Sequence, residues 1–182
     1  MRESWERLLT SGATTMPTID LNDGFLQLHA RLDRLESESA IRRLFTRYMQ
    51  LCDVPCVQPE GVAEALGGLF SPDAVWQGVG RLYTSKFGVL RGRAAIINML
   101  MSYLPPSPHF RTNGHLLGSE HIDVEGDQAR GSWLMQQLSD YEEGSADLIL
   151  ARLDIHFIRI NGVWLISQFQ TERLLSSPLT LA

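Results

Sequence analysis

The sequence is poor in lysine, and its charge balance excludes two classes of partner. Lys86 is the single lysine beside fifteen arginines, and the formal net charge is −5. The arginines are scattered among acidic residues, so they do not form the basic patch that nucleic acids or anionic membrane surfaces require. We therefore expect neither nucleic acid nor a membrane as a partner.

Cysteines and long apolar runs are also scarce. Cys52 and Cys56 are the only cysteines, and without a second Cys/His cluster they make a poor zinc site. No apolar run approaches the roughly 20 residues of a membrane span. The opening MRESWERLLTSG has too short an apolar part for a secretory signal. These features predict a cytoplasmic protein without a metal or cofactor.

The length and composition favour one globular domain. The chain has 182 residues, of which 44% are hydrophobic and 20% charged, enough to bury a sizeable core. The first twenty residues mix polar and small side chains. We therefore predict an N-terminal arm at 1–20, a domain at 21–175 and a C-terminal tail at 176–182.

The first half of the chain has helical periodicity. Apolar residues at 25, 28, 32 and 35 and again from 41 to 52 predict a helix over 21–52. Ser37 and Ser39 interrupt this pattern and favour a break there, with a serine cap. Pro55 ends the helix and leaves Asp53 at its terminus. A helix after Pro59, strands at 73–79 and 87–90, and a helix at 93–104 follow.

The second half has a two-residue period. Strands are predicted at 109–124, 129–140, 147–160 and 163–173, with a hairpin at Asn161-Gly162. A bulge is expected at Gly114 or Gly118. Helices followed by an antiparallel meander predict an α+β domain, with the helices packed on one sheet face. A curved sheet covered in this way leaves a pocket, the usual place for a small ligand.

The order of several short motifs resembles a known family. The motifs span 41–53, 69–75, 91–96, 109–113, 124–129 and 161–166. Together they resemble the SnoaL-like branch of the NTF2-like (cystatin-like) superfamily, over about residues 37–173. The resemblance implies a cone-shaped α+β barrel. The family that the chain resembles includes dehydratases and a dehydrochlorinase.

The resemblance also implies a pair of catalytic side chains. In those enzymes the acid that ends the first helix pairs with a histidine that opens a strand, and the matching residues here are Asp53 and His109. A neutral imidazole is a suitable base near pH 7, and a carboxylate fixes its tautomer. Taken singly, Asp53 is better explained as a helix-end residue and His109 as a strand-start residue; the paired context favours the catalytic interpretation.

Two further polar residues are candidates for the same pocket. Tyr48 corresponds to a position that donates to an oxygen or a leaving group in related enzymes; the alternative is a core tyrosine. Asn113 is a candidate donor to a substrate oxygen, or else satisfies a bulge at Gly114.

Another polar group alternates along the strand 147–160. Arg152, Asp154 and His156 share one face, opposite Leu153 and its apolar neighbours. They form either a polar pocket side, with Arg152 and His156 contacting substrate, or a face turned to solvent or another subunit. We interpret His115 and His121 as surface or sheet residues.

The expected pocket wall is apolar. It is built from Phe45, Trp76, Trp133, Met135 and Phe169. Dehydrochlorinase-type relatives place an arginine where this chain has Phe169, which argues against halide elimination. Since an unpaired anion in a dry site is costly, the wall predicts a neutral ligand.

These features predict a cofactor-independent lyase or isomerase. His109 would remove a proton from a small apolar substrate, aromatic or polycyclic, with Asp53 orienting the imidazole and Tyr48 acting as donor. Two alternatives remain: a non-catalytic β subunit of an aromatic-ring-hydroxylating dioxygenase, and a small-ligand binding module. The resemblance further implies a homo-oligomer, a dimer or trimer.

Overall fold

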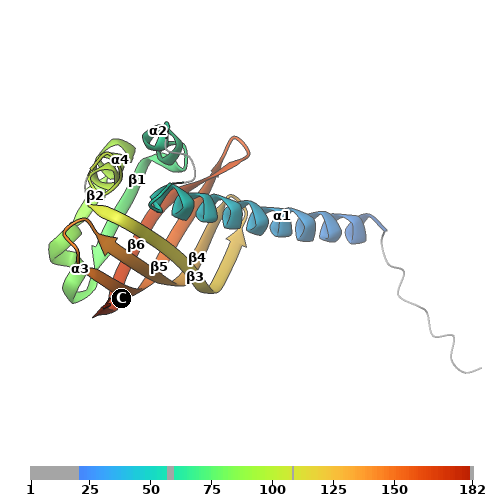
Figure 1. The fold of residues 1–182 in the computed structure, drawn as a ribbon. Helices are drawn as coiled ribbons and strands as arrows, with labels where there is room; N and C mark the ends of the chain where they lie inside the picture. Colours follow the sequence, from blue (N-terminus) through green and yellow to red (C-terminus); the bar gives the residue numbers. More distant parts are fainter. Residues whose placement is uncertain (1–20, 57–59, 108, 181–182) are drawn as a thin grey trace, which may run out of the picture. The chain divides into compact units, whose positions relative to one another are not determined.

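The computed structural model describes residues 21–56, 60–107 and 109–180, whose strands form a curved six-stranded sheet (Figure 1). The strands are β1 (Phe70–Val79), β2 (Val89–Arg91), β3 (Phe110–Glu125), β4 (Gln128–Tyr141), β5 (Ala146–Ile160) and β6 (Val163–Pro178). They lie in the order β2-β1-β6-β5-β4-β3. β1 and β6 are parallel, and the other neighbours are antiparallel. The predicted α+β class is confirmed.

Four helices are described: α1 (Leu21–Cys52), α2 (Val62–Gly67), α3 (Gly80–Phe87) and α4 (Arg93–Met101). The chain divides into a unit ending at Asp33 and a second unit from Arg34 onward. The predicted arm at 1–20 lies outside the described residues. None of the described helices is long and apolar enough to cross a membrane.

The expected break in α1 is wrong, because its two serines are accommodated inside a continuous helix. Arg43 Nη1 donates to Ser39 Oγ at 2.6 Å, one turn away. Arg159 Nη1 lies 3.4 Å from the buried Ser37 Oγ. Side-chain donors satisfy both hydroxyls, so neither serine competes for the helix backbone.

A helix that was not predicted, α3, precedes the strand expected at 87–90. Gly80 and Gly88 bound α3 with φ of 72° and 61°, a region that glycine enters without steric cost. A Cβ on Gly78 would lie 2.6 Å from the Tyr83 carbonyl oxygen, so this glycine lets α3 lie close against β1. The strand expected at 87–90 follows as β2, at Val89–Arg91.

The other differences are small. The helix expected after Pro59 is α2, which ends at Gly67, and β1 begins at Phe70, three residues before the predicted strand. The bulge alternative at Gly118 is confirmed: the β3–β4 register shifts between Gly118 and His121, and Ser119 has φ of 51°. Gly114 pairs regularly with Leu138.

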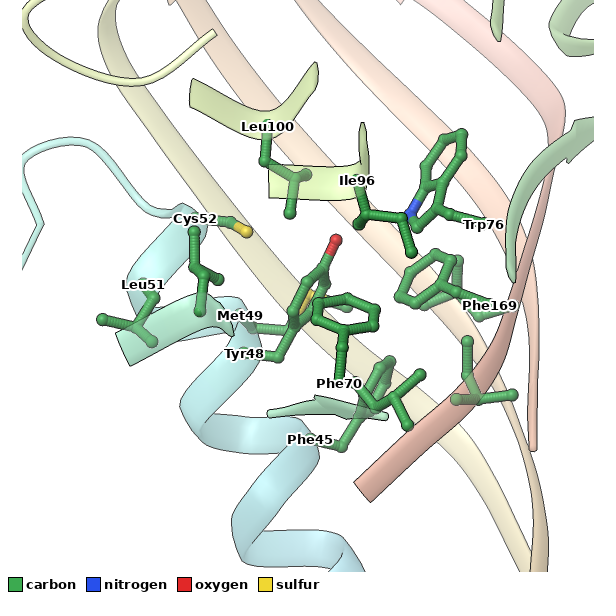
Figure 2. Packing of buried hydrophobic residues seen from close by; sticks show 14 of the residues in the cluster. Phe45, Tyr48, Met49, Leu51, Cys52, Phe70, Trp76, Ile96, Leu100 and Phe169 are labelled. Carbon is green, nitrogen blue, oxygen red and sulfur yellow. The ribbon is translucent and has the colours of Figure 1, made fainter. Parts of the chain in front are cut away.

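Aromatic rings join the end of α1 to the sheet. The Phe45 ring lies 4.3 Å from that of Trp133 and 6.2 Å from that of Phe169, measured between centres. Figure 2 shows Phe45 and Tyr48 on the side of α1 that faces Phe70 and Phe169. This packing holds the last turns of α1 over the sheet, and Tyr48 and Cys52 are thereby directed at the site described next.

Candidate active site

A cavity of about 140 Å³ lies between the helices and the sheet. Its lining includes Tyr48 and Cys52 of α1, Trp76 of β1, Lys86 of α3, Leu100 of α4, and Asn113 and Leu153 of the sheet. The volume is close to that of an engineered protein cavity of about 150 Å³ that holds benzene. As it stands, the cavity has room for one ring.

Most of the predicted site residues lie around this cavity. The lining contains Tyr48, Trp76, His109, Asn113, Met135 and Phe169. Phe45 and Trp133 do not line it: both are almost fully buried and pack on each other in the core. The sequence could not separate the two groups, because core and pocket-wall positions share one hydrophobic periodicity.

The interpretation of Arg152 and His156 as substrate contacts is wrong. Both are exposed on the sheet face opposite the buried Leu153. Arg152 pairs with Glu172 at 3.2 Å, and His156 Nε2 lies 3.7 Å from Asp154. Asp154 in turn accepts both guanidinium bonds of Arg130. Surface ion pairs occupy this face, as the alternative interpretation expected.

The expected pairing of Asp53 with His109 is also wrong, since Asp53 pairs with His115. Asp53 Oδ1 accepts hydrogen bonds from His115 Nδ1 at 2.8 Å and from the His115 backbone N–H at 3.1 Å. His115 has a side chain only 9% exposed, whereas that of Asp53 is 31% exposed. A carboxylate at Nδ1 places the proton there and leaves Nε2 with its lone pair.

A network around Asn113 holds this pair in place. Val54 and Asn113 exchange backbone hydrogen bonds of 2.8 and 2.9 Å, which join the end of α1 to β3. Asn113 Oδ1 accepts from Gln137 and Ser139, both at 2.9 Å. Its amide nitrogen donates to the Cys52 carbonyl at 3.3 Å and lies 3.5 Å from His115 Nε2. Asn113 therefore positions both ends of the pair and does not satisfy a bulge.

His109 lines the cavity in an aromatic setting. Its ring lies edge-on to those of Tyr103 and Tyr141, with centres 4.9 and 5.5 Å away. Burial, and then the nearby charge of Lys86, lower the pKa of His109 below its usual 6.5. His109 is accordingly neutral near pH 7 and a potential proton acceptor.

Another part of the cavity lining carries hydrogen-bond donors. Figure 2 shows the Tyr48 hydroxyl pointing between the Cys52 sulfur and the Trp76 ring nitrogen. Burial, and then Cys52, raise the pKa of Tyr48 well above 10, so the hydroxyl keeps its proton. Trp76 Nε1 is buried beside the Tyr48 hydroxyl, but no described residue accepts a hydrogen bond from it in good geometry. A buried unsatisfied donor is costly, so an acceptor oxygen on a ligand fits here.

His115 and Lys86 are among the cavity residues that the sequence analysis did not assign to the site. Asn113 and His115 alternate on β3, so the two-residue period that put Asn113 at the pocket also predicts His115 there. No comparable signal indicated Lys86, because its helix was not expected. Among the described residues, no group of three His, Cys, Asp or Glu side chains could hold a metal ion.

A curved, mostly antiparallel sheet that follows and packs against helices is the NTF2-like, cystatin-like fold. Residues 33–170 match the family of SnoaL-like domains, and the chain belongs to that family.

Solved structures of the same fold are similar to it. A hexachlorocyclohexane dehydrochlorinase, LinA type 2, is 22% identical, with 84% of this chain and 95% of that chain covered and a TM-score of 0.69. A putative scytalone dehydratase from Novosphingobium aromaticivorans is 17% identical, with 81% and 91% covered and a TM-score of 0.65. An NTF2-like protein from the same species is 26% identical, with 86% and 92% covered and a TM-score of 0.64. A search of curated proteins found no match.

Proposed function

We propose that this protein is a small-molecule lyase or isomerase that removes a proton from a one-ring ligand held in the cavity. The observation that carries the proposal is the 2.8 Å bond from His115 Nδ1 to Asp53. This bond leaves Nε2 as the basic atom of a ring that lines the cavity. Dehydratase and dehydrochlorinase names among the similar structures support the same reaction class.

The proposed step is an elimination from a β-hydroxy ketone. His115 Nε2 takes the proton next to the carbonyl, and the C–H electron pair forms a C=C bond as the C–O bond breaks. The Tyr48 hydroxyl protonates the departing oxygen, so water leaves. The proton on His115 then returns through solvent to Tyr48. Trp76 N–H donates to the carbonyl oxygen, which gains charge as the proton leaves.

His109 is the second candidate for the base in the same reaction. Its lowered pKa keeps the imidazole neutral, and its ring contacts are with aromatic rings. Among the described residues, no carboxylate accepts a hydrogen bond from His109 as Asp53 does from His115. We therefore assign the base role to His115 and expect His109 to contact the ligand.

The test is proton exchange in D₂O with 3-hydroxycyclohexanone as the probe, followed by NMR. The protein should introduce deuterium next to the carbonyl and produce cyclohexenone. His115→Gln and Tyr48→Phe should each slow turnover by about 10²–10⁴-fold, while the matched surface variant His121→Gln should not change it. Saturable binding without exchange or turnover would contradict the proposal and favour a binding module.

A further inference from the structure

The cavity carries a positive charge at one end that no acidic side chain pairs. Lys86 lines the cavity and is exposed, so it marks where the cavity meets solvent. Its Nζ lies 5.0 Å from the Phe87 ring centre and 5.7 Å from that of Tyr103. Within the described residues it forms no ion pair; its contacts are these aromatic faces.

A second cation lies near the same end. The Arg173 guanidinium lies 5.5 Å from the Tyr83 ring centre, and its buried Nε has no hydrogen-bond partner among the described residues. Burial and the charge of Arg173 both lower the pKa of Lys86. Asp147 is the acid that opposes them, and it already accepts the Tyr141 hydroxyl at 3.1 Å. Two cations thus share this end with two acids, Asp147 and, beside His109, Glu143, but neither acid forms an ion pair with Lys86.

We propose that Lys86 binds the carboxylate of a ring-bearing ligand at the cavity mouth. This inference rests on the proposed function and adds the substrate class: a single-ring keto or hydroxy acid. A carboxylate there would gain a charge-assisted hydrogen bond, and Phe87 and Tyr103 would contact the ring. Anchoring one end of the ligand would also fix which ring carbon faces the two histidines, which is how positioning contributes to rate. Lys86 of α3 would thus supply the positive charge that dehydrochlorinase-type relatives have at the position of Phe169.

The test compares 3-oxocyclohexane-1-carboxylate with its carboxamide, a neutral probe of nearly the same shape. Titration calorimetry should show the carboxylate binding about tenfold more tightly. Lys86→Met should remove this preference, and Lys86→Arg should retain most of it. Arg81→Met removes an exposed cation from the same helix and should leave the preference unchanged.

Each outcome separates this inference from the proposed function. Equal binding of the two probes, or no saturable binding of the carboxylate, overturns the role of Lys86. A preference that survives Lys86→Met also overturns it. Deuterium exchange into the same probes reports on the proposed function independently: exchange without a carboxylate preference retains the function and rejects the anchor. A preference for the carboxylate without deuterium exchange retains the anchor and rejects the proposed function.

A different surface, on α1, carries a second inference. Five apolar residues of this helix are each more than half exposed, and all but Leu26 lie in one row: Phe25, Leu28, Leu32 and Leu35. Their 3-4-3 spacing matches the a and d positions of a heptad repeat. Exposed apolar rows of this kind mark interaction sites. The row ends before Ile41 and Phe45, which turn into the core.

The charges beside this row specify the partner. With Phe25 and Leu32 at a positions, Arg31 occupies a g position and Glu36 the e position five residues later. In a parallel two-stranded coiled coil, g of one helix pairs with that e position of the other. Opposite charges at these positions complement a second copy of the same helix. We infer that α1 pairs in parallel with α1 of a second copy, which makes the protein a dimer.

Sedimentation equilibrium of the full chain tests this pairing. The wild type should be dimeric, and Leu28→Asp should weaken association by about 100-fold or more, since a carboxylate would be buried between apolar rows. Val89→Asp, at an equally exposed apolar site on β2, should have no effect. Arg31→Glu and Glu36→Arg should each weaken the dimer by a few-fold, and the double variant should restore it.

A monomeric wild type, or a dimer that Leu28→Asp leaves intact, would overturn the inference. Failure of the double charge variant to restore association would overturn the parallel alignment. Circular dichroism should show unchanged unfolding of the domain in Leu28→Asp, which distinguishes lost association from misfolding.

Discussion

Replacing Asp53 tests its pairing with His115 without any substrate. Asp53 Oδ1 accepts two N–H groups, at 2.8 and 3.1 Å. A hydrogen bond to a charged group contributes about 1.5–3 kcal/mol, and one between neutral groups about 0.5–1.5 kcal/mol. Asparagine keeps an acceptor but loses the charge, whereas alanine leaves both N–H groups without this partner. Because the Asp53 side chain is 31% exposed, solvent reduces both losses. We expect Asp53→Asn to cost about 1 kcal/mol and Asp53→Ala about 2–3 kcal/mol.

Urea unfolding measures these losses, provided that the slope against denaturant is the same in all variants. Nitrogen-15 spectra of the imidazole should show the proton on His115 Nδ1 in the wild type and a loss of that preference in Asp53→Ala. The matched control is Asp123→Ala, which removes the exposed Asp123–His121 contact of 3.1 Å and should have no measurable effect. Equal stability of Asp53→Ala and the wild type, or an equal loss in the control, would refute this reasoning.

Three other predictions concern the surroundings of the cavity. Burial raises the pKa of the Cys52 thiol to about 12, so a thiol reagent near neutral pH should modify Cys56 but not Cys52 in the folded protein, and Cys56→Ser should abolish the reaction. A Cβ on Gly131 would lie 2.2 Å from the Trp133 ring, so Gly131→Ala should lower the free energy of unfolding by about 1–3 kcal/mol. A Cβ on Gly118 would have its nearest contact 3.9 Å away, so Gly118→Ala should lower the free energy of unfolding less. Burial and Lys86 lower the pKa of His109 in the folded protein. The imidazole therefore binds a proton more readily in the unfolded chain. The contribution of His109 to the free energy of unfolding should be lost as pH falls below about 6.5. An NMR titration should place the His109 midpoint below that value, and Lys86→Met should raise it.

The strand half of the fold was predictable because each buried strand alternates clearly. Residues 147–160 have Leu153 and its apolar neighbours on one side and Arg152 and its polar neighbours on the other, and β5 (Ala146–Ile160) has that arrangement. The segment from Gly80 to Phe87 gave no such signal. Its helix depends on two glycines with positive φ and on close packing against Gly78, which are tertiary constraints. Lys86 was overlooked for the same reason.

The choice of histidine follows from strand register, which residue spacing alone does not specify. Val54 pairs with Asn113 in an antiparallel bridge, so the residues before Val54 run alongside those after Asn113. Asp53 is thereby placed next to His115. His109 lies four residues from Asn113 in the opposite direction, up to about 13 Å along an extended strand. One backbone pairing therefore determines which imidazole the carboxylate can orient. A family motif that matches residues 109–113 identifies the strand, but the bridge to the end of α1 selects the partner. Shifting that bridge by two residues would place Asn113 or Leu117 beside Asp53 in place of His115, so the Val54–Asn113 pairing positions the proposed base.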